Sequence, residues 1–114
     1  MKRMVGCGFM FMFLLLLVSA KAAVTCDEAI TSLLPCLPYL IGTNNDPAPT
    51  CCIAVKSLND QASTTPIRRD LCYCFQNAAK SFHVNPEKAK SLPDLCHVQV
   101  PVPIDPNVDC SKIQ

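Results

Sequence analysis

Apolar residues recur at helical spacing over most of the chain, and capping signals divide them into separate helices. The first helix is expected to start at Thr25, because Thr25 and Glu28 form a capping box ahead of an apolar face that continues to Ile41. Pro35 and Pro38 lie within this face and lack main-chain N–H donors, so we expect a kink or a change of direction there.

Three further helices are expected, over residues of about 50–61, 65–80 and 86–93. Thr65 followed by Pro66 marks the start of the third helix, since a capping side chain and a proline in the first turn are typical of helix N-termini. Asn85 followed by Pro86 repeats this signal for a short fourth helix. All four helices are expected to bury one apolar face each, which predicts an all-α fold.

The segment from His97 to the last residue is expected to be extended. Its prolines exclude a regular helix, and its apolar residues alternate instead: Val98, Val100, Val102 and Ile104. The predicted architecture is therefore four short helices with a long extended C-terminal tail that lays one side against them.

Residues 1–22 have the pattern of a secretory signal peptide rather than of a folded segment. The start is basic, residues 9–18 are apolar, and Ala20-Lys21-Ala22 is a small-x-small cleavage site. A permanent N-terminal anchor is the alternative, but the apolar run is short for a bilayer-spanning helix. We therefore expect residues 23–114 to form one mature domain, secreted to the extracellular space or the cell wall.

The cysteine count supports this compartment. The chain has nine cysteines, and Cys7 lies within the leader, which leaves eight. An even number in a short exported chain indicates a disulfide framework. A zinc site is the alternative, but the paired Cys-x2-Cys spacing of such sites is absent from the sequence. On helices, neighbouring cysteines and those two apart point in different directions, so Cys51–Cys52 and Cys72–Cys74 should each reach two partners.

The charge of the mature part is nearly balanced. From Ala23 onward there are seven basic and nine acidic residues, a net charge of −2. No basic tract is present that would hold nucleic acid or an anionic membrane. We expect a monomer with no nucleic-acid partner and with transient membrane contact at most.

The cysteine spacing is Cys26-x9-Cys36-x14-Cys51-Cys52-x19-Cys72-x-Cys74-x21-Cys96-x13-Cys110, and it extends over the whole mature part. It resembles the eight-cysteine pattern of plant non-specific lipid transfer proteins, and the first and central gaps resemble the first type of that family. Pro38-Tyr39-Leu40-Ile41-Gly42 is similar to that type's Pro-Tyr-x-x-Ser signature. Thr64-Thr65-Pro66-Ile67-Arg68 is similar to its Thr-x-x-Asp-Arg signature.

The resemblance implies four disulfides: Cys26–Cys74, Cys36–Cys51, Cys52–Cys96 and Cys72–Cys110. In the second type of the family the two cysteines of the Cys-x-Cys pair exchange partners. The residue between them is usually polar in the first type and apolar in the second, and Tyr73 is amphipathic, so it does not decide between them. The spacing favours the first pattern.

The resemblance also implies an internal hydrophobic tunnel for an acyl chain. Aligned by the cysteines, the residues expected to line it are Leu33, Leu37, Leu40, Val55, Leu58, Phe75, Ala78, Val100, Val102 and Ile104. The absence of Trp and the small number of aromatic residues agree with incomplete filling of the interior. A solid small core made from the same residues is the alternative.

Arg68 matches the family arginine that contacts the polar head of a lipid at the tunnel mouth, and a guanidinium can bind a carboxylate or phosphate bidentately. A surface arginine paired with Asp105 or Asp109 is the alternative. Two family partners of this arginine are replaced, by Ile67 and by Val102. We therefore predict weaker selection for charged head groups and tolerance of less polar ligands such as fatty alcohols.

The leading hypothesis is a secreted carrier of fatty acids, fatty alcohols, phospholipids or other acyl lipids. The second is an inhibitor of hydrolases such as amylases or proteases, with the loops at residues 42–50 and 81–86 as candidate contact segments, although neither carries an evident anchor residue. Catalysis has no support, because neither His83 nor His97 has triad partners at a suggestive spacing. No cofactor and no metal are expected.

Overall fold

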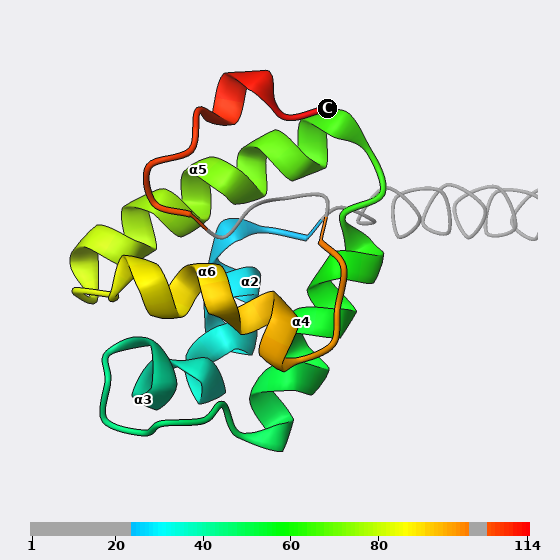
Figure 1. Cartoon of the computed structure of the whole chain (residues 1–114). Coiled ribbons are helices and arrows are strands. Elements are labelled where there is room, and N and C mark those ends of the chain that lie inside the picture. The colour runs from blue at the N-terminus through cyan, green and yellow to red at the C-terminus, as the bar shows by residue number, and fades with distance from the viewer. Residues whose placement is uncertain (1–23, 101–104) are drawn as a thin grey trace, which may run out of the picture.

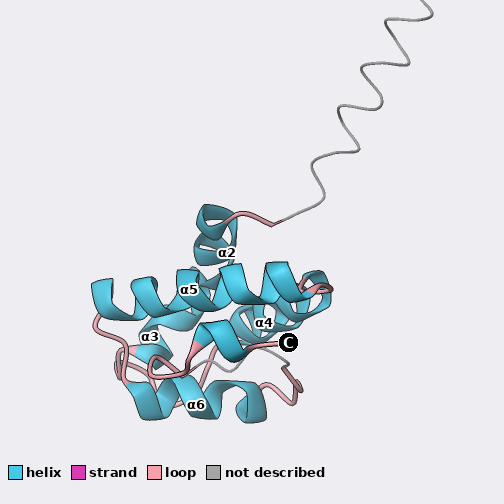
Figure 2. Cartoon of the chain, turned by 90° about the horizontal axis from the view of Figure 1, so that it is seen from above, coloured by secondary structure: helices cyan, strands magenta, loops and turns pink. Residues whose placement is uncertain are grey.

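The computed structural model describes residues 24–100 and 105–114. The expected leader, residues 1–22, lies outside these residues, as do the expected tunnel positions Val102 and Ile104. The described residues form helices and loops without a β-strand, in agreement with the all-α prediction (Figure 2).

The first predicted helix is divided where its prolines lie. Helix α2 (Cys26–Leu33) is followed by a 3-10 turn, η1 (Leu34–Cys36), and by the single-turn helix α3 (Leu37–Leu40). Thr25 caps α2 by accepting a hydrogen bond of 3.2 Å from the main-chain N–H of Glu28. The expected change of direction is therefore confirmed.

The other three helices are α4 (Pro49–Gln61), α5 (Thr65–Ser81) and α6 (Pro86–Leu95). Asn85 caps α6 as predicted, but the predicted cap of α5 is wrong by one residue. Thr64 has the extended backbone of a cap and accepts from the N–H of Ile67, so Pro66 is the second helical residue. Proline at that position costs nothing, because first-turn N–H groups have no partner within the helix.

The predicted end of the fourth helix near Pro93 is also wrong. Pro93 lies inside α6, which continues to Leu95. A proline has no N–H, so α6 lacks the main-chain hydrogen bond that residue 93 would otherwise donate to the oxygen of Ala89. Pro93 is also buried, so its ring contributes packing in return.

The C-terminal segment is mostly non-helical but contains one 3-10 turn, η2 (Cys110–Lys112), where no helix was expected. Asp109 caps this turn by accepting a hydrogen bond of 3.0 Å from the N–H of Ser111. The hydroxyl of Ser111, followed by its main-chain N–H, holds the pKa of Asp109 below its ordinary value. The alternation of apolar residues could not show this local cap.

Four disulfides fasten the helices to one another. They are Cys26–Cys74, Cys36–Cys51, Cys52–Cys96 and Cys72–Cys110. These are the pairs that the resemblance to the first type implies. The two cysteines of α5 bind in opposite directions, one to the start of α2 and one to η2, so the central helix is tied to both ends of the described chain.

The helices are arranged around a common interior (Figures 1 and 2). Helix α2 packs against α4 and α5, α3 packs against α6, and η2 packs against α5. Buried residues form three small clusters rather than one core, and Leu33 packs against two of them. In the part of the chain that the structure describes, every helix is too short or too polar to span a bilayer.

Candidate functional site: two apolar cavities

The larger of two apolar cavities lies among α2, η1, α3, α5 and α6 and has a volume of about 80 Å³. A buried water needs only about 10–15 Å³ of such volume, so the space is large enough for several water-sized groups. The residues that line it are Ile30, Leu33, Leu34, Leu37, Leu40, Cys72, Phe75, Gln76, Ala78, Ala79, Phe82, Val84, Ala89, Leu92, Asp105 and Pro106. The wall is almost entirely aliphatic or aromatic.

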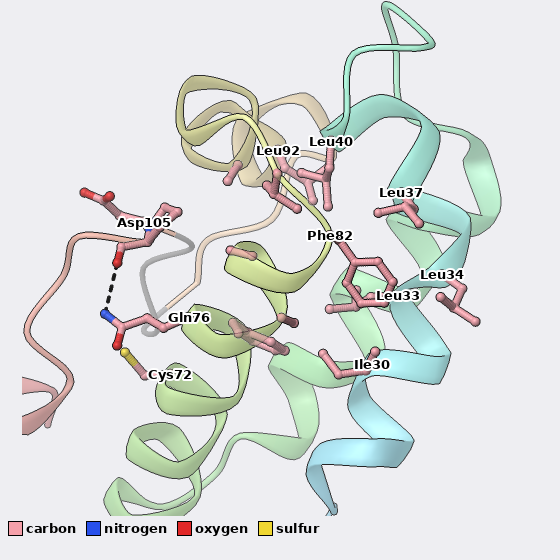
Figure 3. Close-up of a pocket in the computed structure, with 16 residues that line it drawn as sticks. Ile30, Leu33, Leu34, Leu37, Leu40, Cys72, Gln76, Phe82, Leu92 and Asp105 are labelled. Atoms are coloured by element: carbon pink, nitrogen blue, oxygen red, sulfur yellow. Dashed lines mark hydrogen bonds between the residues drawn. The ribbon is translucent and has the colours of Figure 1, made fainter.

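One side of this cavity is apolar up to the molecular surface. Leu34 and Phe82 are 48% and 41% exposed although both line the cavity. Figure 3 shows Phe82 beside Ile30, Leu33 and Leu34. This side of the wall therefore offers an apolar entrance formed by Leu34 of η1 and by Phe82, the residue that follows α5.

The opposite side carries the few polar groups of the wall. The side-chain amide of Gln76 donates to the main-chain oxygen of Pro106 at 3.3 Å (Figure 3) and also to that of Val108. Asp105 pairs with Lys90 at 3.8 Å, so it is not the partner of Arg68. Because the pair is partly exposed, it contributes little to stability. At the polar side of the larger cavity, the ammonium group of Lys90 therefore lies beside the carboxylate of Asp105.

The smaller cavity lies among α2, α4 and α5 and has a volume of about 30 Å³. The residues that line it are Leu33, Val55, Leu58, Asn59, Ala62, Leu71, Phe75 and Val100. Seven of these eight are apolar, and Asn59 is the exception. The cavity is large enough for two or so water-sized groups.

Leu33 and Phe75 line both cavities and form the partition between them. Neither side chain is fully buried, since each has a cavity on two sides instead of close-packed neighbours. Rotamer changes of such side chains meet less steric resistance than those of a close-packed core. The two cavities therefore adjoin at Leu33 and Phe75.

Arg68 lies beside the smaller cavity rather than in its wall. Its Nε donates to the main-chain oxygen of Ala62 at 2.9 Å, and Ala62 lines that cavity. Its Nη1 donates to the main-chain oxygen of Gln114 at 3.0 Å. A guanidinium has five N–H donors, so three remain for other partners. In the described residues Arg68 forms no ion pair with Asp109.

Eight of the residues that the sequence predicted to line the tunnel lie in the described part of the chain, and they divide between the two cavities. Leu37, Leu40 and Ala78 line the larger one, Val55, Leu58 and Val100 line the smaller one, and Leu33 and Phe75 line both. Sequence reasoning missed several residues, which are Ile30, Leu34, Cys72, Gln76, Ala79, Phe82, Val84, Ala89, Leu92, Asp105 and Pro106 in the larger cavity and Asn59, Ala62 and Leu71 in the smaller one. The helical spacing of Ile30, Leu33 and Leu34 could have identified the first of them.

His83 and His97 line neither cavity and lie in the turns that follow α5 and α6, where both are exposed with positive φ. Within residues 24–100 and 105–114 no group of His, Cys, Asp or Glu is arranged to hold a metal ion. The described walls of both cavities are predominantly apolar.

Residues 10–105 match a protein-family model described as "Probable lipid transfer". A non-specific lipid-transfer protein of Pinus taeda is 43% identical over 97 residues, covering 84% of this chain and 79% of the relative. The chain belongs to the family of plant non-specific lipid-transfer proteins. Two structures solved for members of this family share the fold of this chain.

One of these structures is the barley non-specific lipid transfer protein 1 in complex with lysophosphatidylcholine. It has a TM-score of 0.73 and 35% identity, covering 80% of this chain and 100% of the barley chain. The other is the wheat non-specific transfer protein complexed with two molecules of phospholipid. It has a TM-score of 0.72 and 34% identity, covering 79% of this chain and 100% of the wheat chain.

Proposed function

We propose that this chain is a secreted carrier that binds lipids by enclosing their acyl chains in the two apolar cavities, without catalysing a reaction. The observation that carries the proposal is the pair of cavities itself, of about 80 and 30 Å³, with apolar walls and a shared partition. Each methylene moved from water into such a cavity contributes about 0.8 kcal/mol to the binding free energy. Affinity should therefore depend more on chain length than on the head group.

Family membership supports acyl lipids as the ligand class. The barley relative was solved with lysophosphatidylcholine and the wheat relative with phospholipid, both of which carry acyl chains. We assign the same ligand class to this chain because Leu, Ile, Val, Ala and Phe predominate in the walls of its own two cavities. The relatives are named as lipid-transfer proteins, which gives the hydrolase-inhibitor alternative no support.

The head-group side is expected to be permissive. Arg68 already donates to two main-chain oxygens, and its neighbour Ile67 cannot accept a hydrogen bond from a ligand through its side chain. Three remaining donors on Arg68 are enough to bind an acid or a phosphate at the edge of the smaller cavity. An uncharged head group should lose little binding free energy at this edge of the cavity. Fatty alcohols should therefore bind as well as fatty acids of equal chain length.

Secretion is proposed from residues 1–22, which have a basic start, an apolar run and a small-x-small site. The four disulfides agree with an oxidising compartment.

The test is displacement of a fluorescent fatty acid from the oxidised protein by acids and alcohols of 10 to 18 carbons. We expect saturable displacement, with about a fourfold gain per added methylene until the cavities are filled. Alcohols and acids of one length should differ much less than lengths differ from one another. Absence of saturable displacement at any length would overturn the proposed function.

A further inference from the structure

Two exposed apolar side chains differ from the others because they also line a cavity. The described part of the chain exposes six large apolar residues, which are Leu34, Ile41, Ile53, Tyr73, Phe82 and Leu95. Among these six, only Leu34 and Phe82 belong to the wall of the larger cavity, and they lie on the same side of it (Figure 3). Their outer surface is therefore continuous with the apolar interior, and we name these two side chains the entrance face.

The sequence around the entrance face is almost free of charge. Within four residues of Leu34 in either direction there is no Asp, Glu, Lys or Arg, and within four residues of Phe82 there is only Lys80. A lysine beside an apolar surface can lay its methylenes along that surface and keep its ammonium group in water. No charged group of these two segments would therefore lose its hydration if the entrance face left water.

The entrance face is too small for a stable contact with a second copy of this chain. A side chain of this size that is about half exposed presents on the order of 100 Å². Leu34 and Phe82 together thus offer much less than the roughly 800 Å² that each partner buries in a typical stable complex. A lipid surface sets no such minimum, because each side chain that enters it gains free energy in proportion to its own apolar area.

We infer that the entrance face docks on the uncharged surface of a phospholipid bilayer, with Leu34 and Phe82 inserted at the boundary between head groups and acyl chains. In this position the larger cavity opens toward the acyl chains, so a lipid chain can enter it along an apolar wall without crossing water. The inference rests on the proposed function, because docking gives a lipid carrier the place where it exchanges its ligand. Docking through apolar area alone is weak and independent of salt.

The experiment measures how much of the oxidised protein sediments with sucrose-loaded phosphatidylcholine vesicles. Uptake of a lipid alone leaves the protein in the supernatant, so protein in the pellet reports docking. For Leu34→Ser and for Phe82→Ser we expect the partition coefficient to fall about fivefold to tenfold, since each variant loses one half-exposed apolar side chain.

Ile53→Ser is the matched control. Ile53 is 69% exposed on α4 and lines neither cavity, so the partition coefficient of this variant should stay within about twofold of the wild-type value. An equal loss in Ile53→Ser would overturn the inference, and so would wild-type protein that does not sediment at millimolar phosphatidylcholine.

The other occupants of this face are outcomes of the same experiment. Sedimentation that requires anionic lipid and disappears at about 0.5 M salt would assign docking to cations such as Lys80 and would overturn the inference. A wild-type dimer in analytical ultracentrifugation that is lost in Leu34→Ser would make a second copy the occupant and would overturn it as well.

A second measurement needs no variant, which matters because Leu34 and Phe82 also line the cavity. A soluble gadolinium chelate broadens the NMR signals of methyl groups that water reaches. Phosphatidylcholine vesicles should protect the methyls of Leu34 from this broadening and leave that of Ile53 unchanged, and equal protection of both would contradict the inference.

Failure of docking and failure of the proposed function are distinguishable. If fatty acids displace the fluorescent probe from the wild-type protein but the protein does not sediment with vesicles, the inference falls and the proposed function stands. If no ligand displaces the probe, the proposed function falls and the inference falls with it.

Discussion

The two cavities share a partition but differ in what they offer a ligand. The larger, of about 80 Å³, opens beside half-exposed apolar side chains, and its polar groups are already paired with other parts of the chain. The smaller, of about 30 Å³, has Asn59 in its wall and Arg68 beside it. Under the proposed function, the larger cavity would supply affinity through apolar volume, whereas the smaller one would supply selection through the few polar groups near it.

Filling the larger cavity should have the largest effect. Ala78→Phe places a ring in its wall and removes space for about three methylenes, so we expect acyl ligands of 16 carbons to bind about 50-fold more weakly. Overpacking costs about 1–3 kcal/mol of stability, which four disulfides can tolerate. Displacement of a fluorescent fatty acid measures the loss.

The matched control is Asn77→Phe, which adds the same ring to an exposed position of α5 and should leave affinity within about twofold. Equal affinities of wild-type protein and Ala78→Phe would show that the larger cavity does not hold the chain.

Removing the partition should change chain-length preference. Phe75→Ala joins the two cavities, so the length at which affinity stops rising should increase by about two carbons. The variant should also lose about 2–4 kcal/mol of stability, because a half-buried ring is truncated. Isothermal titration with saturated acids of 10 to 20 carbons measures the limit.

Tyr73→Ala is the control for this change, because Tyr73 is 49% exposed on α5 and lines neither cavity. Its limiting length should equal that of the wild-type protein. A limit that moves equally in both variants would mean that the change does not come from the partition.

Arg68→Ala should affect acids more than alcohols. We expect a fatty acid to bind about threefold to fivefold more weakly and the alcohol of equal length to change by less than twofold, since only the acid carries charge for the guanidinium. Loss of hydrogen bonds to Ala62 and Gln114 should lower stability by about 1–2 kcal/mol.

Arg69→Ala is the matched control, because Arg69 donates to the main-chain oxygen of Ile113 at 2.8 Å without such a link to the smaller cavity. It should lower stability slightly and leave the ratio of acid to alcohol affinity unchanged. Loss of acid affinity in both variants would assign the effect to net charge or to the C-terminal segment.

Breaking the ion pair between Lys90 and Asp105 should have the smallest effect on stability and on ligand affinity. Both side chains are partly exposed and 3.8 Å apart, so Lys90→Ala should change stability by less than about 1 kcal/mol and affinity by less than about twofold. Thermal unfolding and the displacement assay check both values. A large loss of affinity would mean that the polar side of the larger cavity contacts the ligand.

Local rules account for most of the helix boundaries. Thr25 and Asn85 are capping residues in the structure as in the sequence, and the prolines of the first helix divide it. Thr64 and Thr65 are both capable caps, so backbone conformation decides between them. Pro93 is buried inside α6, where its ring packs although it cannot donate a main-chain hydrogen bond, and spacing alone does not show this.

The candidate site was predictable in part. Positions on α2, α3, α4 and α5 follow from the alignment of the cysteines to the family, and Leu33 and Phe75 are among them. Ala89 and Leu92 enter the larger cavity from α6, whose place depends on the disulfide Cys52–Cys96 and on packing against α3. The hydrogen bond from Nδ2 of Asn59 to the main-chain oxygen of Gln99 joins residues that are forty apart in the sequence, so only the folded chain reveals it.

The most direct test of the account is methyl NMR of the oxidised protein during titration with a fatty acid of 16 carbons. The account predicts shifts at Leu37, in the larger cavity, at Val55, in the smaller one, and at Leu33 between them. Ile53, which is 69% exposed on α4, should not move. Shifts confined to Ile53 and other surface methyls, or no saturable shift at all, would contradict enclosure of the chain within these cavities.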